Sequence, residues 1–211
     1  MSRETIYKAL RASGLGHVGA CAILGNMQAE SGLSAAIAQR GATELSDAAY
    51  TAKADAGELD FAHDGVGYGL CQWTYPGRKA ALLSFARERG VSVGDEQMQA
   101  AFCVRELRES YPELWKTLLA GEELYTCTKL VCLLYERPAV NNVSARWAFA
   151  REIDEALRTE GGFSTAVLLL QLAMREDGYW PDKADGIQSA VFQKTFAAYA
   201  ADVAACGKEE A

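Results

Sequence analysis

The sequence predicts a mainly helical α+β protein with one small β-hairpin, followed by a small helical module. Most of the chain consists of segments in which apolar residues recur every three or four positions, as they do on one face of a helix. The exception is the segment Gly65–Trp73, where glycines alternate with apolar and aromatic residues, as in a tight hairpin. The composition changes again at Thr159–Phe163. This boundary divides the chain into a first domain over residues 1–158 and a module over residues 164–207.

In the first domain, helix-stop and turn residues separate the periodic segments. Gly14 and Gly90 each follow an apolar pattern that they would end, and Pro76-Gly77 precedes another. Between residues 34 and 64 the pattern weakens into short polar and alanine-rich pieces, which we expect to form turns. The predicted helices of this domain cover residues of about 3–12, 17–31, 78–89, 95–109, 113–119, 124–135 and 142–158.

The C-terminal module is predicted from two apolar segments and the loop between them. Residues 165–175 form a strongly apolar helix, and residues 178–186 form a turn-rich loop. The final helix carries apolar residues at i, i+4, i+7 and i+11, namely Phe192, Phe196, Tyr199 and Val203. These helices must bury a face, either against each other or against another surface.

Glu30 is the candidate catalytic acid. On a helix over residues 17–31, Ile23, Met27 and Glu30 fall at i, i+4 and i+7, so the carboxyl group shares a face with two apolar side chains. Loss of water raises the pKa of a carboxyl group, and so does the negative end of the helix dipole. A carboxyl group that keeps its proton near neutral pH can donate it to a leaving oxygen. A surface acid at a helix end is the alternative.

The segment Gly65–Trp73 has a composition suited to sugar binding. Its glycines remove bulk from one edge, while Tyr68 and Trp73 offer ring faces and Gln72 offers an amide. Such groups suit a polyhydroxylated, N-acetylated ligand. Ordinary tight hairpins have the same composition, so this segment by itself leaves both interpretations open.

Three motifs together resemble the phage tail lysozyme family, whose lysozyme-like fold is close to that of goose-type lysozymes and lytic transglycosylases. They read GNMQAESGL, GYGLCQWTYPGRKAALLSFA and LYERPAVNNVSARWAFA, and the resemblance extends over about residues 2–158. It implies cleavage of the peptidoglycan glycan strand between N-acetylmuramic acid and N-acetylglucosamine. It also implies that Glu30 is the general acid and that Gly69–Gln72 lines the substrate groove.

The resemblance further implies that residues 135–142 form part of the groove wall, although their proline and amides would equally end one helix and cap the next. In the C-terminal module, Asp185-Gly186-Ile187 resembles part of small peptidoglycan-binding modules, and wall binding and plain packing both remain open for it. The candidate substrate-binding residues are Asn26, Tyr68, Gly69, Gln72, Trp73, Tyr135 and Asn141.

Asp64 is the candidate second carboxylate. A hydrolase needs a further acid to position water or stabilise the sugar cation, whereas a lytic transglycosylase manages with one. Asp64 directly precedes the glycine-spaced segment, while Asp55, Glu58 and Asp60 look like solvated loop residues. An Asx turn before Gly65 is the alternative role for Asp64.

Composition excludes several classes of function. A net charge of −7 argues against a nucleic-acid partner, because neutralising phosphates requires a basic surface. No apolar run suggests a signal peptide or a membrane span, so we expect delivery to the wall by a phage particle or through a host membrane pore. With two histidines and no C-x-x-C pair, we expect neither a metal nor a cofactor. We expect a monomer whose partner is the glycan strand.

Two alternatives to a glycan-cleaving enzyme remain. One is a cysteine peptidase or amidase that uses Cys71, although both histidines precede Cys71 whereas such folds place the histidine after the cysteine. Most of the six cysteines look instead like small buried hydrophobes. The other alternative is an inactive wall-binding or phage-tail structural protein on the same scaffold, which the fold alone does not exclude.

Overall fold

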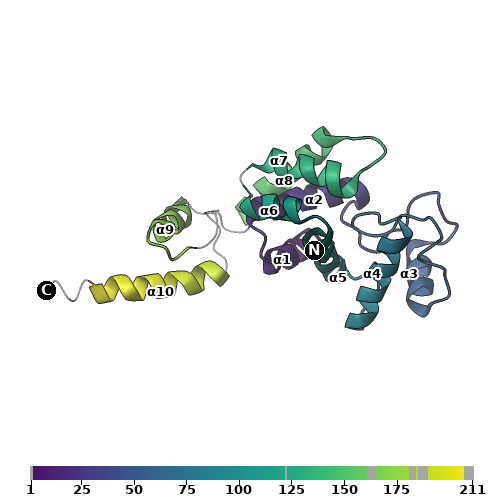
Figure 1. Ribbon diagram of the computed structural model, residues 1–211, viewed down its shortest axis with the longest axis horizontal. Helices are drawn as coiled ribbons and strands as arrows, with labels where there is room; N and C mark the ends of the chain where they lie inside the picture. The colour runs from purple at the N-terminus through teal and green to yellow at the C-terminus, as the bar shows by residue number, and fades with distance from the viewer. Residues whose placement is uncertain (1, 122, 161–164, 181–183, 185–189, 207–211) are drawn as a thin grey trace. The chain divides into compact units, whose positions relative to one another are not determined.

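A computed structural model describes residues 2–121, 123–160, 165–180, 184 and 190–206 (Figure 1). The chain forms two compact units, residues 1–153 and 154–211, and their boundary falls inside a helix. The expected linker at residues 159–163 stays a prediction, because residues 161–164 lie outside the described part. The Asp185-Gly186-Ile187 motif lies outside it as well.

The mainly helical class is confirmed, and most helices begin and end within two residues of their predicted limits. In chain order the elements are α1 (Ser2–Ala12), α2 (His17–Ser31), α3 (Asp47–Ala56), α4 (Pro76–Arg89), α5 (Glu96–Ser110), α6 (Pro112–Ala120), α7 (Leu124–Leu130), the π-helix η1 (Val131–Glu136), α8 (Val143–Glu160), α9 (Thr165–Glu176) and α10 (Ala190–Cys206).

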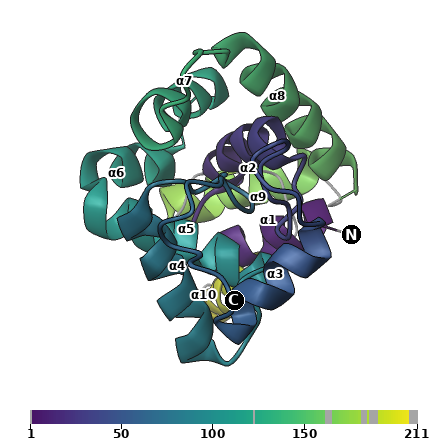
Figure 2. The same cartoon turned by 90° about the vertical axis from the view of Figure 1, so that its right-hand side faces the viewer.

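Helix α2 is the central element of the first unit (Figure 2). It packs against α1, α6, α7 and η1, and residues Ala20–Met27 are all buried. A helix that is apolar on every side is stable only when neighbours cover all of its faces. Because Glu30 follows this buried stretch in the last turn, the fold places it where the helix emerges from the core.

Helix α3 lies in the segment that was predicted to form turns. Ser46 caps its N-terminus by accepting a hydrogen bond from the Ala49 N–H at 3.3 Å, and Gly57 ends it in the left-handed conformation. Only Tyr50 and Ala54 are buried, so the apolar spacing is too sparse to indicate a helix. The cap residues were the available signal.

The predicted β-hairpin is not confirmed, since no regular strand occurs in the described residues. Tyr68 and Trp73 instead form an isolated antiparallel bridge, with N–H to carbonyl distances of 3.1 and 3.0 Å. Gly69 has φ +74° and a Cβ there would lie 2.4 Å from Gln99 Oε1, which accepts the Leu70 N–H at 2.8 Å. On its other side Tyr68 bridges to Ala38, so isolated bridges and one side-chain amide hold this segment in place of a regular hairpin.

The helix predicted over residues 124–135 changes from α to π at Val131. The π-helix η1 ends at Arg137, whose φ is +52° and whose N–H donates to the Cys132 carbonyl at 2.8 Å. π-Helical turns occur mostly where function requires a particular side-chain placement. Here the irregular turn places Tyr135 and Glu136 beside the end of α2, against which η1 packs.

Helix α8 approaches α2 closely through Gly25. A Cβ on Gly25 would lie 2.5 Å from Ala150 Cβ and 2.7 Å from Ala150 Cα, so only glycine permits this contact. Arg146 lies about one helical turn before Ala150 on α8, and Glu30 lies between one and two turns after Gly25 on α2. The close crossing of the two helices therefore brings the Arg146 and Glu30 side chains together.

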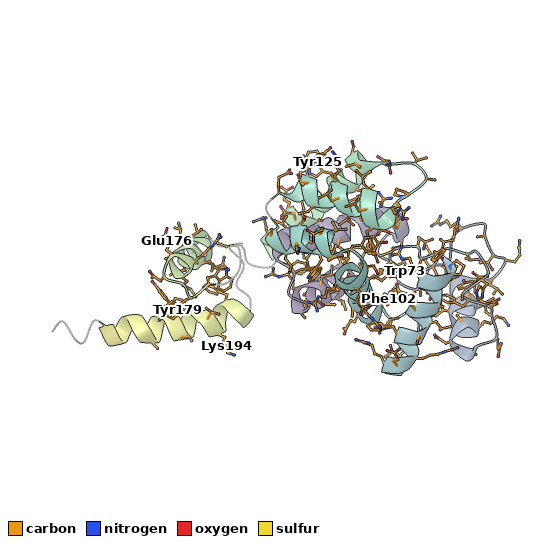
Figure 3. The ribbon with its side chains drawn as sticks, viewed as in Figure 1. Trp73, Phe102, Tyr125, Glu176, Tyr179 and Lys194 are labelled. Carbon is orange, nitrogen blue, oxygen red and sulfur yellow. The ribbon has the colours of Figure 1, made fainter. Side chains whose placement is uncertain are left out.

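The second unit has a small aromatic core of its own. Met174 on α9, Trp180 after it and Phe192 on α10 are buried, and Phe196 and Tyr199 pack against them. The Tyr179 ring lies edge-on to the Tyr199 ring, with centroids 5.3 Å apart. Figure 3 labels Tyr179 between α9 and α10. The predicted apolar stripe on the last helix is thus partly buried within this unit.

Candidate active site

Glu30 forms an ion pair with Arg146 at the end of α2. Glu30 Oε1 lies 2.5 Å from Arg146 Nη2, and the two side chains are 18% and 6% exposed. Arg146 Nη1 also donates to Asn26 Oδ1 at 3.2 Å. A charge-assisted bond of this kind stabilises the ionised form of a carboxyl group.

Asn26 orients this pair from within the core. Its amide nitrogen donates to the carbonyls of Ala22 at 2.9 Å and Thr128 at 3.1 Å, and its side chain is fully buried. With both amide protons engaged, the amide oxygen has a fixed direction, toward Arg146. Asn26 therefore positions the guanidinium group, and its burial argues against the expected contact with a sugar.

Glu136, the last residue of η1, is a second carboxyl group next to Glu30. Burial raises its pKa to about 8, and the negative charge of Glu30 adds to this rise. The nearby cations Arg78 and Arg146 and a hydrogen bond with Cys71 oppose it. With this pKa Glu136 holds a proton at neutral pH, whereas Glu30 is ion-paired with Arg146.

The family resemblance places Glu136 in the groove wall and gives it no catalytic role. The available signal was an acid at the end of the apolar run VCLLY, where an ionised side chain is costly.

Glu106 on α5 joins the aromatic residues of the site. Arg78 donates to both of its oxygens, at 2.7 and 2.8 Å, and Trp73 Nε1 and the Tyr135 hydroxyl each donate to Oε2, at 2.8 and 2.7 Å. The Arg78 guanidinium also lies 4.6 Å from the centre of the Tyr135 ring. Sequence reasoning did not single out Glu106, whose four contacts all come from other segments.

Three of the predicted sugar-binding aromatic residues are buried. Tyr68 and Trp73 have no exposed surface and Tyr135 is 1% exposed. The Trp73 ring packs edge-on against Phe102, with centroids 5.5 Å apart. Both residues are labelled in Figure 3. Trp73 and Tyr135 donate to Glu106, whereas Tyr68 stacks on Tyr50, and the burial of all three rings argues against direct stacking on a sugar.

Of the other predicted binding residues, Gly69 is buried, whereas Gln72 and Asn141 keep some surface. Gln72 is partly exposed and its amide donates to the carbonyl of Gly69 at 3.1 Å, and Asn141 is exposed in the loop before α8. These two side chains remain candidates for direct substrate contact.

Asp64 lies in a different polar cluster, between α3 and α4. Its carboxylate accepts hydrogen bonds from Lys79 Nζ at 2.5 Å, from the Tyr50 hydroxyl at 2.6 Å and from the Val66 N–H at 3.0 Å. The last of these is the Asx-turn bond that was the alternative role. Lys79 is completely buried, so Asp64 neutralises a charge inside the protein. These contacts explain Asp64 without any catalytic role.

Cys71 contacts Glu136 and Cys103 but lacks the character of a nucleophile. It is 4% exposed, and burial, together with the hydrogen bond to Cys103, raises the pKa of its thiol. The reactive form of cysteine is the thiolate, which this environment disfavours.

We expect Cys71→Ser to retain most of the lytic activity, because serine keeps a donor for Glu136. Wall-clearing rates of the folded variant test this. A loss of several orders of magnitude with an unchanged melting temperature would restore the peptidase or amidase alternative.

Comparison with known proteins identifies a family for this chain. The sequence profile of the phage tail lysozyme family matches residues 2–157, about three quarters of the chain. Among curated proteins, none matches the sequence significantly. In the described part of the chain, no helix has the length and apolarity required to cross a membrane. The match spans Glu30, Glu136 and Arg146, and the chain therefore belongs to the phage tail lysozyme family.

Proposed function

We propose that this protein cleaves the β-1,4 bond between N-acetylmuramic acid and N-acetylglucosamine in the peptidoglycan glycan strand. Membership in the family implies peptidoglycan-lytic activity in a phage context. The observation that carries the finer proposal is the pair of carboxyl groups, Glu30 and Glu136, held in different environments at the end of α2. Different environments move the pKa values of two carboxyl groups apart, so that one can act as the acid and the other as the base.

In this mechanism Glu30 protonates the glycosidic oxygen, as its place in the family motif implies, and Glu136 is the second carboxyl group. We expect the pair to carry one proton at neutral pH, because burial raises the pKa of Glu136 to about 8 and Glu30 is ion-paired with Arg146. Cleavage needs this condition, with one carboxyl able to give a proton and the other able to stabilise the sugar cation or activate water.

The second carboxyl group favours hydrolysis over lytic transglycosylation. A hydrolase adds water to the cleaved sugar and leaves a reducing end, while a transglycosylase closes an anhydro ring. We therefore expect the wild-type protein to release fragments with reducing ends. Mass spectrometry of the soluble products from purified walls distinguishes the two, since they differ by one water.

Other products would contradict the proposal in recognisable ways. Intact glycan strands with cleaved peptides would indicate an amidase or peptidase. Cosedimentation with walls and no soluble fragments would support the alternative of a catalytically inactive wall-binding or tail structural protein.

The second unit is proposed to assist wall binding. Its aromatic core gives it internal packing, which an independent binding module requires. The proposed place of action of the whole chain is the bacterial wall, reached from a phage particle or through a membrane pore.

A further inference from the structure

Arg146 has an unused donor inside the protein. Its residue surface is 5% exposed, and its Nε–H makes no hydrogen bond to any of the described residues. Nη2 and Nη1 are occupied by Glu30 and Asn26. A buried donor without an acceptor is costly, so its persistence indicates a role.

The unused donor belongs to a fork that suits carboxylates. In a guanidinium group, Nε and one terminal nitrogen form an edge that binds both oxygens of a carboxylate, as Arg78 does with Glu106 in this protein. Arg146 gives Glu30 one bond only. It therefore retains capacity for a second carboxylate, and Glu136 is close enough to be affected by its charge.

We propose that Arg146 is a positioning residue that determines which carboxyl group, Glu30 or Glu136, carries the proton they share. This proposal rests on the function proposed above. While Arg146 contacts Glu30, the proton stays on Glu136. When the guanidinium group turns its Nε–H toward Glu136, the proton moves to Glu30, which can then give it to the substrate.

The step is balanced as a proton transfer. The O–H bond of Glu136 breaks and an O–H bond forms on Glu30, so Glu136 becomes the carboxylate and Glu30 the acid. Arg146 keeps its charge throughout, because a guanidinium group is not deprotonated in proteins. The net charge of the three groups is unchanged, and the transfer needs no other reactant.

Arg146 contacts Glu30 directly, whereas both Arg78 and Arg146 act on Glu136, and Arg78 has the larger effect. The donors of Arg78 are already engaged, because Glu106 binds its guanidinium group at two points. Other titratable groups of the site include Cys71, Cys132 and Tyr135, and burial raises the pKa of each, which keeps them neutral.

The first test is the pH dependence of wall cleavage in Arg146→Gln. Without the cation, both carboxyl groups hold protons more strongly, so the acidic limb of the activity profile should move up by about one to three pH units. Arg146→Lys, which keeps the charge, should move it less. The control is Arg151→Gln, which removes a positive charge from an exposed position on the same helix.

The second test uses Glu136→Gln, which removes the proton store and should lower activity at neutral pH by at least about tenfold. Adding Arg146→Gln to this variant should raise its activity near pH 6, because Glu30 is then free to take a proton from solvent. In the wild-type background, Arg146→Gln should lower the activity near pH 6, because the acidic limb of the profile moves up. A merely structural arginine would lower activity in both backgrounds.

The proposal would be overturned if folded Arg146→Gln has the same acidic limb as the wild-type protein. It would also be overturned if Arg146→Gln changes the activity near pH 6 in the same direction in the wild-type protein and in Glu136→Gln. If Arg146→Gln does not fold, undiminished activity of Glu136→Gln at neutral pH would overturn it instead. These outcomes leave the cleavage of walls by the wild-type protein intact. The proposed function itself would fail separately, through the products of the wild-type protein.

Discussion

Glu30→Gln is expected to lower the rate of wall clearing by at least about 100-fold while the protein remains folded. Glutamine has the shape of the acid but no proton to give, and loss of a general acid costs about two to four orders of magnitude. Its amide oxygen can still accept from Arg146 Nη2, so we expect the free energy of unfolding to fall by about 1–3 kcal/mol at most. Turbidity of purified walls and thermal unfolding measure the two effects.

A matched control is Glu58→Gln, which neutralises an exposed acid of the loop before Asp64. It should leave both the rate and the melting temperature unchanged. A Glu30→Gln variant that clears walls at more than about a tenth of the wild-type rate would show that Glu30 is not the acid.

Lys79→Met is expected to lower the free energy of unfolding by about 3–5 kcal/mol. Lys79 is fully buried and donates to Asp64 Oδ1 at 2.5 Å, to the Val66 carbonyl at 2.7 Å and to the Tyr50 hydroxyl at 2.9 Å. Removing it leaves the Asp64 carboxylate without its counter-ion in a largely dry site. Denaturant unfolding followed by circular dichroism measures the loss.

Asp64→Asn should cost a similar amount, because it strands the Lys79 ammonium group, whose pKa burial already lowers. The double variant should recover part of the stability, since neither charge is then left unpaired. Independent, additive losses would contradict the idea that the two residues stabilise the fold as a pair.

The same variants decide whether Asp64 takes part in catalysis. With a structural role alone, Asp64→Asn should clear walls within about tenfold of the wild-type rate at temperatures where it is folded, since a general acid or base contributes at least about 100-fold. If Asp64 is the second carboxylate, activity should fall far below this and should not recover in the double variant.

The sequence by itself determined most of the helices, α3 being the exception, and the place of Glu30. Helix limits depend on apolar spacing and on nearby stop residues, such as Gly14 and Gly90, and the structure has a helix boundary near each. The motif around Glu30 also predicted the family, which the profile match confirms. These features depend on residues within one or two helical turns, so they can be read along the chain.

Only the tertiary structure decided which polar groups meet. Arg146 reaches Glu30 from 116 positions away, and Tyr135 and Trp73 reach Glu106 from 29 and 33 positions away. Asp64 seemed a catalytic candidate because its buried partner Lys79 could not be seen in the local pattern. Likewise, the pKa of Glu136 depends on how much water the packed helices exclude and on the charge of Glu30, and both are set by long-range packing.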